Sequence, residues 1–202
     1  MGIYRQVQTT YDQIVLDYAR RNHFNMSDNL VALARELAEH SGPSGRLVDI
    51  GCGTGRDMAW FEFHKITTIG IDLSMGMLAY ARENVHGELV SMNMRNLGFR
   101  EAFFDGVWCC ASLLHLPKAE AVYALQEIRR ILKLGGMLIL SIQEGKDEGW
   151  EDGSIPGAKR FFARYQENEM KNILSANKFA VLKTDSSQTV ERNWLSFTCI
   201  AE

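Results

Sequence analysis

Short apolar runs alternate with helix-like segments between residues 46 and 143 of this chain. The runs RLVDI (46–50), DGVWCCASLL (105–114) and MLILSIQ (137–143) are rich in apolar residues. Strands of this kind are buried on both faces, as happens when helices cover a parallel sheet on either side. The alternation therefore predicts an α/β fold: a doubly wound, Rossmann-like sheet that is mostly parallel, with helices on both faces.

The same patterns locate the other elements. We expect strands at 67–73 and 88–94, and helices at 11–22, 28–39, 74–84, 118–132 and 166–177, with a short one from about Asp57. The 118–132 helix should end at a glycine of KLGG, and the stretch 144–160, rich in glycine and charge, should be a loop. FAVLKTD and WLSFTCIA near the end of the chain have no helix between them, so they predict an antiparallel hairpin at one edge of the sheet.

Three glycines follow directly after the first apolar run, in LVDIGCGTGRD (47–57). Glycine loses the most backbone freedom on folding, so Gly51, Gly53 and Gly55 indicate a bend that a ligand approaches closely. In doubly wound sheets, ligands bind beyond the carboxyl ends of the strands, where the winding direction reverses. The glycine bend is therefore expected at the ligand site.

Asp72 comes 17 residues after Gly55, at the end of the second predicted strand. An acid at about this separation is placed to accept hydrogen bonds from both hydroxyls of a ribose. A glycine-rich turn with Asp72 capping the next helix would explain either feature alone, but not both together. The two features predict a site for an adenosine-containing ligand.

The spacing of the glycines and a second acid narrow the ligand further. A dinucleotide site needs G-x-G-x-x-G, whereas this chain has G-x-G-x-G with Asp49 two residues before it. A carboxylate so close to the bend would repel a pyrophosphate and attract a cation. S-adenosylmethionine carries a sulfonium and an ammonium group and no phosphate, so these charges favour it.

Four stretches of the chain resemble the class I S-adenosylmethionine-dependent methyltransferases: LVDIGCGTGRD, IGIDLSMGMLAYAR, FFDGVWCCASLLHL and EIRRILKLGGMLILSI. They occur in the order typical of that family and cover about residues 46–143. The tail QEGKDEGWEDG…RFFARYQENEM is also similar to a bacterial subgroup that acts on small molecules. The resemblance implies one domain over 1–202, with an N-terminal helical cap (1–45), a cofactor-binding core (46–143) and an acceptor-side loop, helix and hairpin (144–202).

The resemblance also implies roles for the residues of the core. Asp49 and the main chain of Gly51 and Gly53 would hold the methionine part of the cofactor, and Asp72 its ribose. Asn93 stands where the family often has aspartate, and its amide oxygen would accept a hydrogen bond from the adenine amino group. The predicted cofactor-binding set is Tyr18, Asp49, Gly51, Cys52, Gly53, Arg56, Asp72, Leu73, Met77, Asn93, Met94 and Ala111. Asp57 is at least as well explained by helix capping and the helix dipole.

His115 follows the predicted fourth strand, where the acceptor usually sits in similar proteins. A histidine there has the right pKa range for a general base, although packing over the cofactor or capping the next helix explains it equally well. Tyr11 and Tyr18 share one face of the first helix, where core packing is an alternative for one of them. The predicted substrate-binding residues are Tyr11, Trp150, Arg160 and Tyr165, with Arg164 interpreted as a solvated surface residue.

Composition argues against other kinds of partner. The net charge of −3 and the absence of a dense Lys/Arg run disfavour nucleic acid. The four cysteines form no C-x-x-C pair and no zinc spacing appears, so we expect buried, reduced cysteines and no metal. No apolar stretch reaches the length of a membrane span and the N-terminus lacks a signal core, so a cytoplasmic monomer or homodimer is expected.

The predicted function is transfer of a methyl group from S-adenosylmethionine to an O, N or C nucleophile of a small molecule, by in-line displacement. An alternative is a protein that binds S-adenosylmethionine without transferring its methyl group. A less favoured one is an NAD-dependent oxidoreductase on the same fold.

Overall fold

The computed structural model of the chain describes residues 2–22, 26–152, 155, 157–189 and 192–202. The helices are α1 (Ile3–Arg21), α2 (Asp28–Ser41), α3 (Arg56–Phe63), α4 (Met75–Arg82), α5 (Lys118–Ile131) and α6 (Glu167–Ala176). The strands are β1 (Leu47–Ile50), β2 (Thr68–Asp72), β3 (Leu89–Ser91), β4 (Phe104–Cys110), β5 (Leu132–Gln143), β6 (Glu148–Asp152), β7 (Lys159–Ala163), β8 (Phe179–Gln188) and β9 (Asn193–Ala201).

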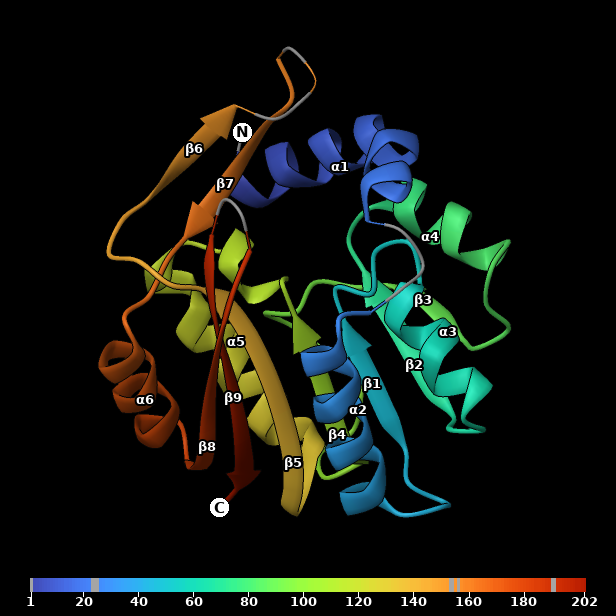
Figure 1. The fold of residues 1–202 in the computed structure, drawn as a ribbon, viewed down its shortest axis with the longest axis vertical. Helices are drawn as coiled ribbons and strands as arrows, with labels where there is room; N and C mark the ends of the chain where they lie inside the picture. Colours follow the sequence, from blue (N-terminus) through green and yellow to red (C-terminus); the bar gives the residue numbers. More distant parts are fainter. Residues whose placement is uncertain (1, 23–25, 153–154, 156, 190–191) are drawn as a thin grey trace.

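Seven of these strands form one sheet in the order β3-β2-β1-β4-β5-β9-β8, with β6 and β7 paired separately (Figure 1). β1 to β5 are parallel to one another, and β9 runs antiparallel between β5 and β8. The predicted doubly wound fold with an antiparallel hairpin at one edge is confirmed. The winding reverses between β1 and β4, which are neighbours in the sheet.

The apolar runs are buried because both faces of the sheet are covered. Along β5, Leu138 and Leu140 belong to a cluster that includes residues of α5 and α6, whereas Ile139 packs in a cluster with residues of α2 and α3. Successive side chains of a strand point to opposite faces, so one uninterrupted run serves two cores.

Several expected boundaries differ from the structure, three of them for reasons that the backbone shows. The first helix begins at Ile3 rather than near residue 11, since nothing after Gly2 interrupts it. α5 ends at Ile131 and passes directly into β5, so glycine does not cap it; Gly135 (φ +76°) instead lies within β5, at the irregular start of its pairing with β4. β4 ends at Cys110 because Ala111 takes a φ of +57°, and a short 3₁₀ turn, Leu113–His115, follows.

The prediction of a loop over 144–160 was wrong. β6 and β7 form a hairpin in which Trp150 pairs with Phe161 and Glu151 with Arg160. Cross-strand contacts between these aromatic and charged side chains stabilise the hairpin. The many glycine and charged residues of the segment had indicated a loop instead.

α1 and the β6–β7 hairpin lie beyond the carboxyl ends of the parallel strands (Figure 1). The carboxylate of Asp12 on α1 accepts hydrogen bonds from Ser74 Oγ (2.6 Å) and Gly76 N (2.9 Å) at the start of α4. On the other side, Thr10 Oγ1 donates to the carbonyl of Lys159 on β7 (2.8 Å). These bonds hold α1 as a cover between α4 and the hairpin.

The structure also bears on membranes and metals. Among the described helices, none has the length and apolar character needed to cross a bilayer. No three His, Cys, Asp or Glu side chains in the described part of the chain gather as metal ligands would.

Candidate functional site

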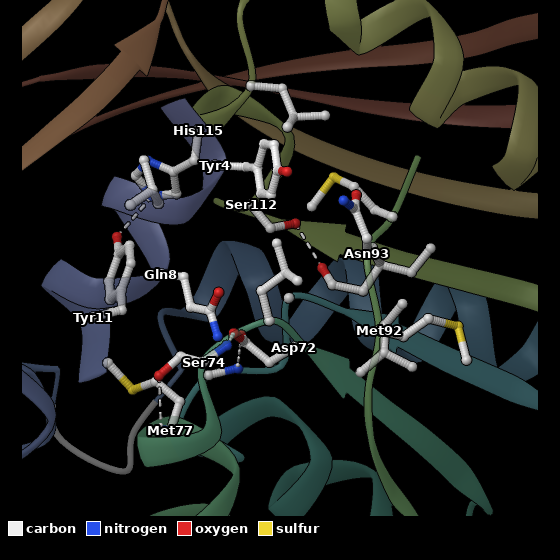
Figure 2. Close-up of a pocket in the computed structure, with 18 of the residues that line it drawn as sticks. Tyr4, Gln8, Tyr11, Asp72, Ser74, Met77, Met92, Asn93, Ser112 and His115 are labelled. Carbon is white, nitrogen blue, oxygen red and sulfur yellow. Dashed lines mark hydrogen bonds between the residues drawn. The ribbon is translucent and has the colours of Figure 1, made fainter. Parts of the chain in front are cut away.

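Two adjoining cavities lie beneath α1 at the carboxyl ends of β1, β2 and β4. The first lies between α1, the end of β2 and the segment that follows β3 (Figure 2). The second lies toward the hairpin and the β8–β9 end of the sheet. Six residues line both cavities: Tyr11, Tyr18, Gly51, Gly53, Ala111 and His115.

The glycines after β1 serve two separate purposes. Gly51 has a φ of +78°, and a Cβ there would lie 2.3 Å from Cβ of Ser112, so only glycine fits. Gly53 also has a positive φ, but a Cβ on it would meet nothing within 4 Å. Gly51 thus permits close packing within the protein, while Gly53 leaves its main chain open at the cavities.

The carboxylate of Asp72 is fixed at the wall of the first cavity. Its Oδ2 accepts from Gly53 N (2.9 Å) and its Oδ1 from Ser74 N (2.8 Å). Burial raises the pKa of Asp72, and these backbone hydrogen bonds partly oppose the rise. The N-cap of α4 is Ser74, whose side chain accepts from Met77 N, so Asp72 is not the capping residue.

Asp49 differs from Asp72 because part of its carboxylate has no partner. It is only 3% exposed, and its Oδ2 is buried without a hydrogen bond at the wall of the second cavity. Burial, and then repulsion from Asp57, raise the pKa of Asp49 well above its usual range. A buried carboxylate without a partner is unfavourable, so this position would be stabilised by a bound cation.

Asp57 at the start of α3 has a structural role. Its Oδ1 pairs with Arg56 Nε (2.6 Å), and its Oδ2 accepts from the indole Nε1 of Trp108 (2.8 Å). Both oxygens are therefore engaged within the protein, while Arg56 itself lines the second cavity.

His115 stands where the two cavities meet, and its hydrogen bonds fix its tautomer. Nδ1 lies 2.7 Å from the carbonyl oxygen of Phe161, which can only accept, so Nδ1 carries the proton. Nε2 is then an acceptor and receives the hydroxyl hydrogen of Tyr11, at 2.7 Å. Burial lowers the pKa of His115 to about 4. The ring is a neutral base hydrogen-bonded to a phenol.

Aromatic rings surround this pair. Tyr11 contacts Tyr18 edge to face at 5.7 Å between centroids, and His115 lies 5.0 Å from Phe162. Burial, followed by the nearby Tyr18, raises the pKa of Tyr11, and the guanidinium of Arg160 opposes that rise. Tyr11 therefore keeps its proton and donates it to His115.

Comparisons with known proteins agree with this geometry. A family described as "Methyltransferase domain" matches residues 48–140. The chain is 31% identical to a phosphatidylethanolamine N-methyltransferase of Cereibacter sphaeroides over 139 residues, 65% of either chain. It is 30% identical to a putative methyltransferase of Encephalitozoon cuniculi over 163 residues, which cover 79% of this chain and 68% of that one.

The chain belongs to the class I S-adenosylmethionine-dependent methyltransferases. Its fold is similar to that of the 1,6-didemethyltoxoflavin-N1-methyltransferase of Burkholderia thailandensis, with a TM-score of 0.78 and 20% identity, covering 98% of this chain and 88% of that one. The alignments span 65% and 68% of the lengths of the first two relatives. The predicted family is thus confirmed. Its members use S-adenosylmethionine as the methyl donor, so the predicted cofactor is confirmed as well.

The residues predicted for the cofactor gather at these two cavities of the methyltransferase. The first is lined by Tyr18, Gly51, Gly53, Asp72, Leu73, Met77, Asn93, Met94 and Ala111. The second is lined by Asp49, Cys52 and Arg56 together with Tyr18, Gly51, Gly53 and Ala111. Their roles toward the cofactor stay predictions.

The structure argues against the predicted role of the Asn93 oxygen. Its Oδ1 already accepts hydrogen bonds from Arg95 N (3.0 Å) and Arg95 Nε (3.2 Å). Since a carbonyl oxygen has two lone pairs, nothing is left for an adenine amino group. Asn93 still lines the first cavity of the methyltransferase, beside the main chain of Met94.

The predicted substrate residues are not all brought together. Tyr11 and Arg160 line the second cavity, with His115 between the two cavities. Trp150 and Tyr165 line neither of them. Trp150 packs edge to face on Phe161 at 5.6 Å, and Tyr165 is fully buried in the main core. Tyr165 follows β7 on the side of α5, where the Lys118 ammonium lies 4.8 Å from its ring centroid.

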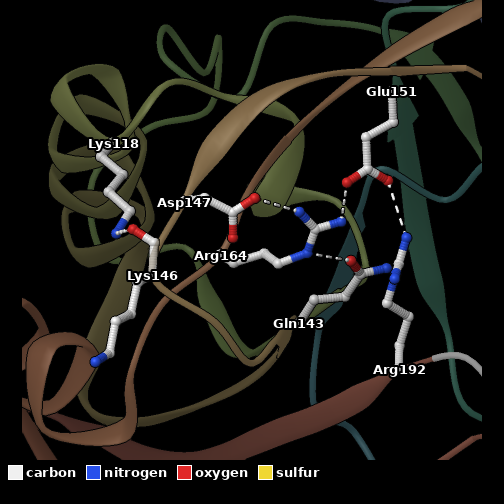
Figure 3. Close-up of polar contacts among 7 residues, drawn as sticks. All are labelled: Lys118, Gln143, Lys146, Asp147, Glu151, Arg164 and Arg192. Carbon is white, nitrogen blue, oxygen red and sulfur yellow. Dashed lines mark hydrogen bonds and ion pairs between the residues drawn. The ribbon is translucent and has the colours of Figure 1, made fainter.

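The interpretation of Arg164 as a solvated surface residue was wrong. It is 7% exposed, and its guanidinium pairs with Asp147 at 2.9 Å and with Glu151 (Figure 3). Glu151 also accepts from Arg192 Nη2 (3.1 Å), which connects the hairpin to the turn between β8 and β9. Charge alone could not distinguish this buried arginine from an exposed one.

Sequence reasoning missed several residues of the cavity walls. Tyr4 and Gln8 of α1 line the first cavity, and Phe162 lines the second. Tyr4, Gln8, Tyr11 and Tyr18 are spaced to share one helical face, so this signal was present in the chain. It was overlooked because the helix was expected to begin only near residue 11.

Proposed function

We propose that this protein transfers a methyl group from S-adenosylmethionine to a small-molecule acceptor. The observation that carries the proposal is the buried, unpartnered Oδ2 of Asp49 beside the open main chain of Gly53. A cationic amino acid group bound there would satisfy the carboxylate. A pyrophosphate would instead meet three carboxylates, those of Asp49, Asp57 and Asp72, around the same bend.

The residues present fit the two ends of the cofactor. Asp49 would hold its ammonium group, and Asp72 would accept from its ribose hydroxyls while Gly53 N and Ser74 N keep the carboxylate in place. Leu73, Met77 and Met94 offer apolar contacts for adenine in the first cavity. When bound, S-adenosylmethionine supplies an electrophilic methyl group on its sulfonium sulfur.

The second cavity is the proposed site of the acceptor. α1 and the hairpin enclose it, and Tyr11, His115 and Phe162 form its wall nearest the first cavity. Holding the acceptor in line with the methyl group accounts for much of the catalysis in such a site. Where the nucleophile loses a proton, Tyr11 would accept that proton and donate its own to the unprotonated Nε2 of His115.

One structural neighbour supports a small acceptor rather than a macromolecule. The neighbour from Burkholderia thailandensis has 1,6-didemethyltoxoflavin and S-adenosylhomocysteine bound, and it matches 98% of this chain. The 1,6-didemethyltoxoflavin bound to that protein is a small molecule, which supports a small acceptor here.

Calorimetric titration with S-adenosylmethionine tests the cofactor assignment. Asp72→Ala should weaken binding by more than about tenfold, since two hydrogen bonds to a charged group are lost. Asp49→Asn should weaken binding similarly, because the amide cannot neutralise the ammonium group. Glu101→Gln, at an exposed turn before β4, is the matched control and should bind as the unmodified protein does.

Circular dichroism should show that all three variants keep the fold. Unchanged affinity in Asp72→Ala would remove the ribose assignment. Tighter binding of NADH than of S-adenosylmethionine by the unmodified protein would contradict the proposed function.

A further inference from the structure

Most charged side chains that line the second cavity form ion pairs within the protein. Arg56 pairs with Asp57 (2.6 Å), Arg21 with Asp17 (3.0 Å) and Arg192 with Glu151 (3.1 Å). Two charged groups differ from these: Asp49, discussed above, and Arg160. Because unpaired charges in a partly buried site are unfavourable, each suggests a ligand group of opposite charge.

Arg160 lies on β7, where its cross-strand partner is Glu151. That carboxylate is already occupied by Arg164 and Arg192 (Figure 3). Within the described residues Arg160 has no ion pair, and its Nε is buried without a hydrogen-bond partner. The guanidinium packs over the ring of Phe162, 5.1 Å from its centroid, which fixes its direction.

Arg160 lies on the acceptor side of the site rather than beside the amino acid end of the cofactor. The charges that act on Asp49 are those of Asp57, Arg56 and Asp72. Arg160 acts instead on Tyr11, through its charge and a hydrogen bond from its guanidinium to the phenol oxygen, and after burial its charge acts on the pKa of His115. Arg56 and Arg160 therefore serve different ends of the two cavities.

We propose that the methyl acceptor is a small planar acid whose carboxylate pairs with Arg160 while its nucleophilic O–H or N–H group faces Tyr11. This inference rests on the proposed function and specifies its acceptor. The rings of Tyr11, Phe162 and Trp194 along the second cavity provide apolar faces for a planar body between the two polar ends. A guanidinium is suited to bind a carboxylate through two parallel hydrogen bonds.

The hydrogen-bond chain at Tyr11 favours a nucleophile that carries a hydrogen. The acceptor's O–H or N–H bond breaks as its new bond to the methyl carbon forms, and the electron pair of the cleaved carbon–sulfur bond stays on sulfur. Tyr11 receives the acceptor's proton and gives its own to Nε2 of His115. One cation is lost at sulfur and one is formed at the imidazole, so the net charge of the buried site does not change. The product is an ether or a methylated amine, and not a methyl ester.

Binding of matched acids and amides tests the inference. Protein saturated with S-adenosylhomocysteine is titrated calorimetrically with ortho-, meta- and para-hydroxybenzoate and with the corresponding hydroxybenzamides. At least one acid should bind about tenfold more tightly than its neutral amide, as a charge-assisted pair predicts. Arg160→Met should abolish this preference and Arg160→Lys should retain part of it. Lys159→Met, on the exposed neighbour in β7, is the control and should keep the preference.

Three results would overturn the inference. They are equal binding of acids and amides, no measurable binding of any acid, and loss of S-adenosylhomocysteine affinity in Arg160→Met, which would assign Arg160 to the cofactor. Mass spectrometry of turnover mixtures provides a further check, because a methyl ester would show that the carboxylate is the nucleophile. Failure of S-adenosylhomocysteine to bind the unmodified protein would instead contradict the proposed function itself.

Discussion

His115 shows how two hydrogen bonds determine the chemistry of one side chain. The carbonyl of Phe161 holds the proton on Nδ1, which leaves Nε2 to accept from Tyr11. Because burial lowers the pKa of His115 to about 4, the ring is neutral throughout the physiological range. It can accept a proton only when neutral, so activity should be lost only as the pH falls toward this value.

The first prediction at this scale is a pH profile. His115→Gln should lower kcat by roughly 10²–10⁴-fold, the range typical of a general base, while leaving S-adenosylmethionine affinity unchanged. The kcat/KM of the unmodified enzyme should stay level from about pH 8 to about pH 5, since a base with this pKa remains neutral there. A decline centred near pH 6.5 would show that the imidazole is not held neutral. His86→Gln, on an exposed histidine, serves as the control.

The same pKa links stability to pH. The unfolded chain binds a proton at the ordinary histidine pKa of about 6.5, whereas the folded protein binds it only near pH 4. Stability is therefore unaffected by His115 above pH 6.5 and falls progressively as the pH drops toward 4. The melting temperature of His115→Gln should fall less between pH 7 and pH 5 than that of the unmodified protein.

Part of this site could be predicted from the sequence, and the rest could not, for a physical reason. Asp49 and Asp72 could be singled out because each lies at or next to the end of a short strand, Asp49 two residues before the glycine bend and Asp72 17 residues after Gly55. The Tyr11–His115 bond joins residues 104 positions apart, and no local pattern indicates it. Tyr165 lies two residues beyond β7. That strand contributes Arg160 to the second cavity, yet the side chain of Tyr165 is buried in the core. The sequence pattern did not show where β7 ends, so it could not separate these two residues.

At the scale of elements, α1 depends on bonds at both of its sides. Asp12 alone accepts from Ser74 Oγ and Gly76 N, so it joins α1 to the start of α4. Ser74 also caps α4 and donates its backbone N–H to Asp72. The position of α1 is thereby linked to the position of the Asp72 carboxylate, which we propose binds the ribose.

The second prediction concerns this connection. Asp12→Ala removes two hydrogen bonds worth about 1 kcal/mol each, so amide exchange in α1 should accelerate by about tenfold or more while β1 and β4 stay protected. S-adenosylmethionine should bind several-fold more weakly. Asp17→Ala is the control, since it removes an ion pair to Arg21 within α1 itself. Unaltered exchange in α1 would show that the helix is held by its apolar contacts alone.

Elements were predicted well where apolar runs are buried on both faces, as in β4 and β5. The hairpin was missed because β6 and β7 are short and partly exposed, and their pairing places charged residues opposite one another. The alternation of apolar and polar residues that marks a buried strand is weak when a strand is partly exposed. The sequence therefore predicted the main sheet better than the hairpin that lines the second cavity.

For the whole molecule, the unpaired carboxylate of Asp49 links binding to stability. It is unfavourable in the free protein, and a bound cation would relieve it. S-adenosylhomocysteine at a hundred times its Kd should raise the free energy of unfolding by about 2.7 kcal/mol, which corresponds to roughly 5–10 °C in Tm for a chain of this size. Scanning calorimetry with and without the ligand measures this.

Asp49→Asn separates the two effects. The free variant should melt higher than the unmodified protein, because the buried charge is gone. Its Tm should rise less on adding S-adenosylhomocysteine at the same concentration. A free variant less stable than the unmodified protein would show that Asp49 has an internal partner after all.

The β6–β7 hairpin forms no strand pairing with the main sheet. It nevertheless carries Arg160 and, with Glu151, one wall of the second cavity. If the second cavity holds the acceptor as proposed, amino acid replacements along this hairpin alter which compounds are methylated without disturbing β1, β2 or the glycine bend. Evolution could then retune such an enzyme toward new metabolites through one short hairpin, while the proposed donor site is preserved.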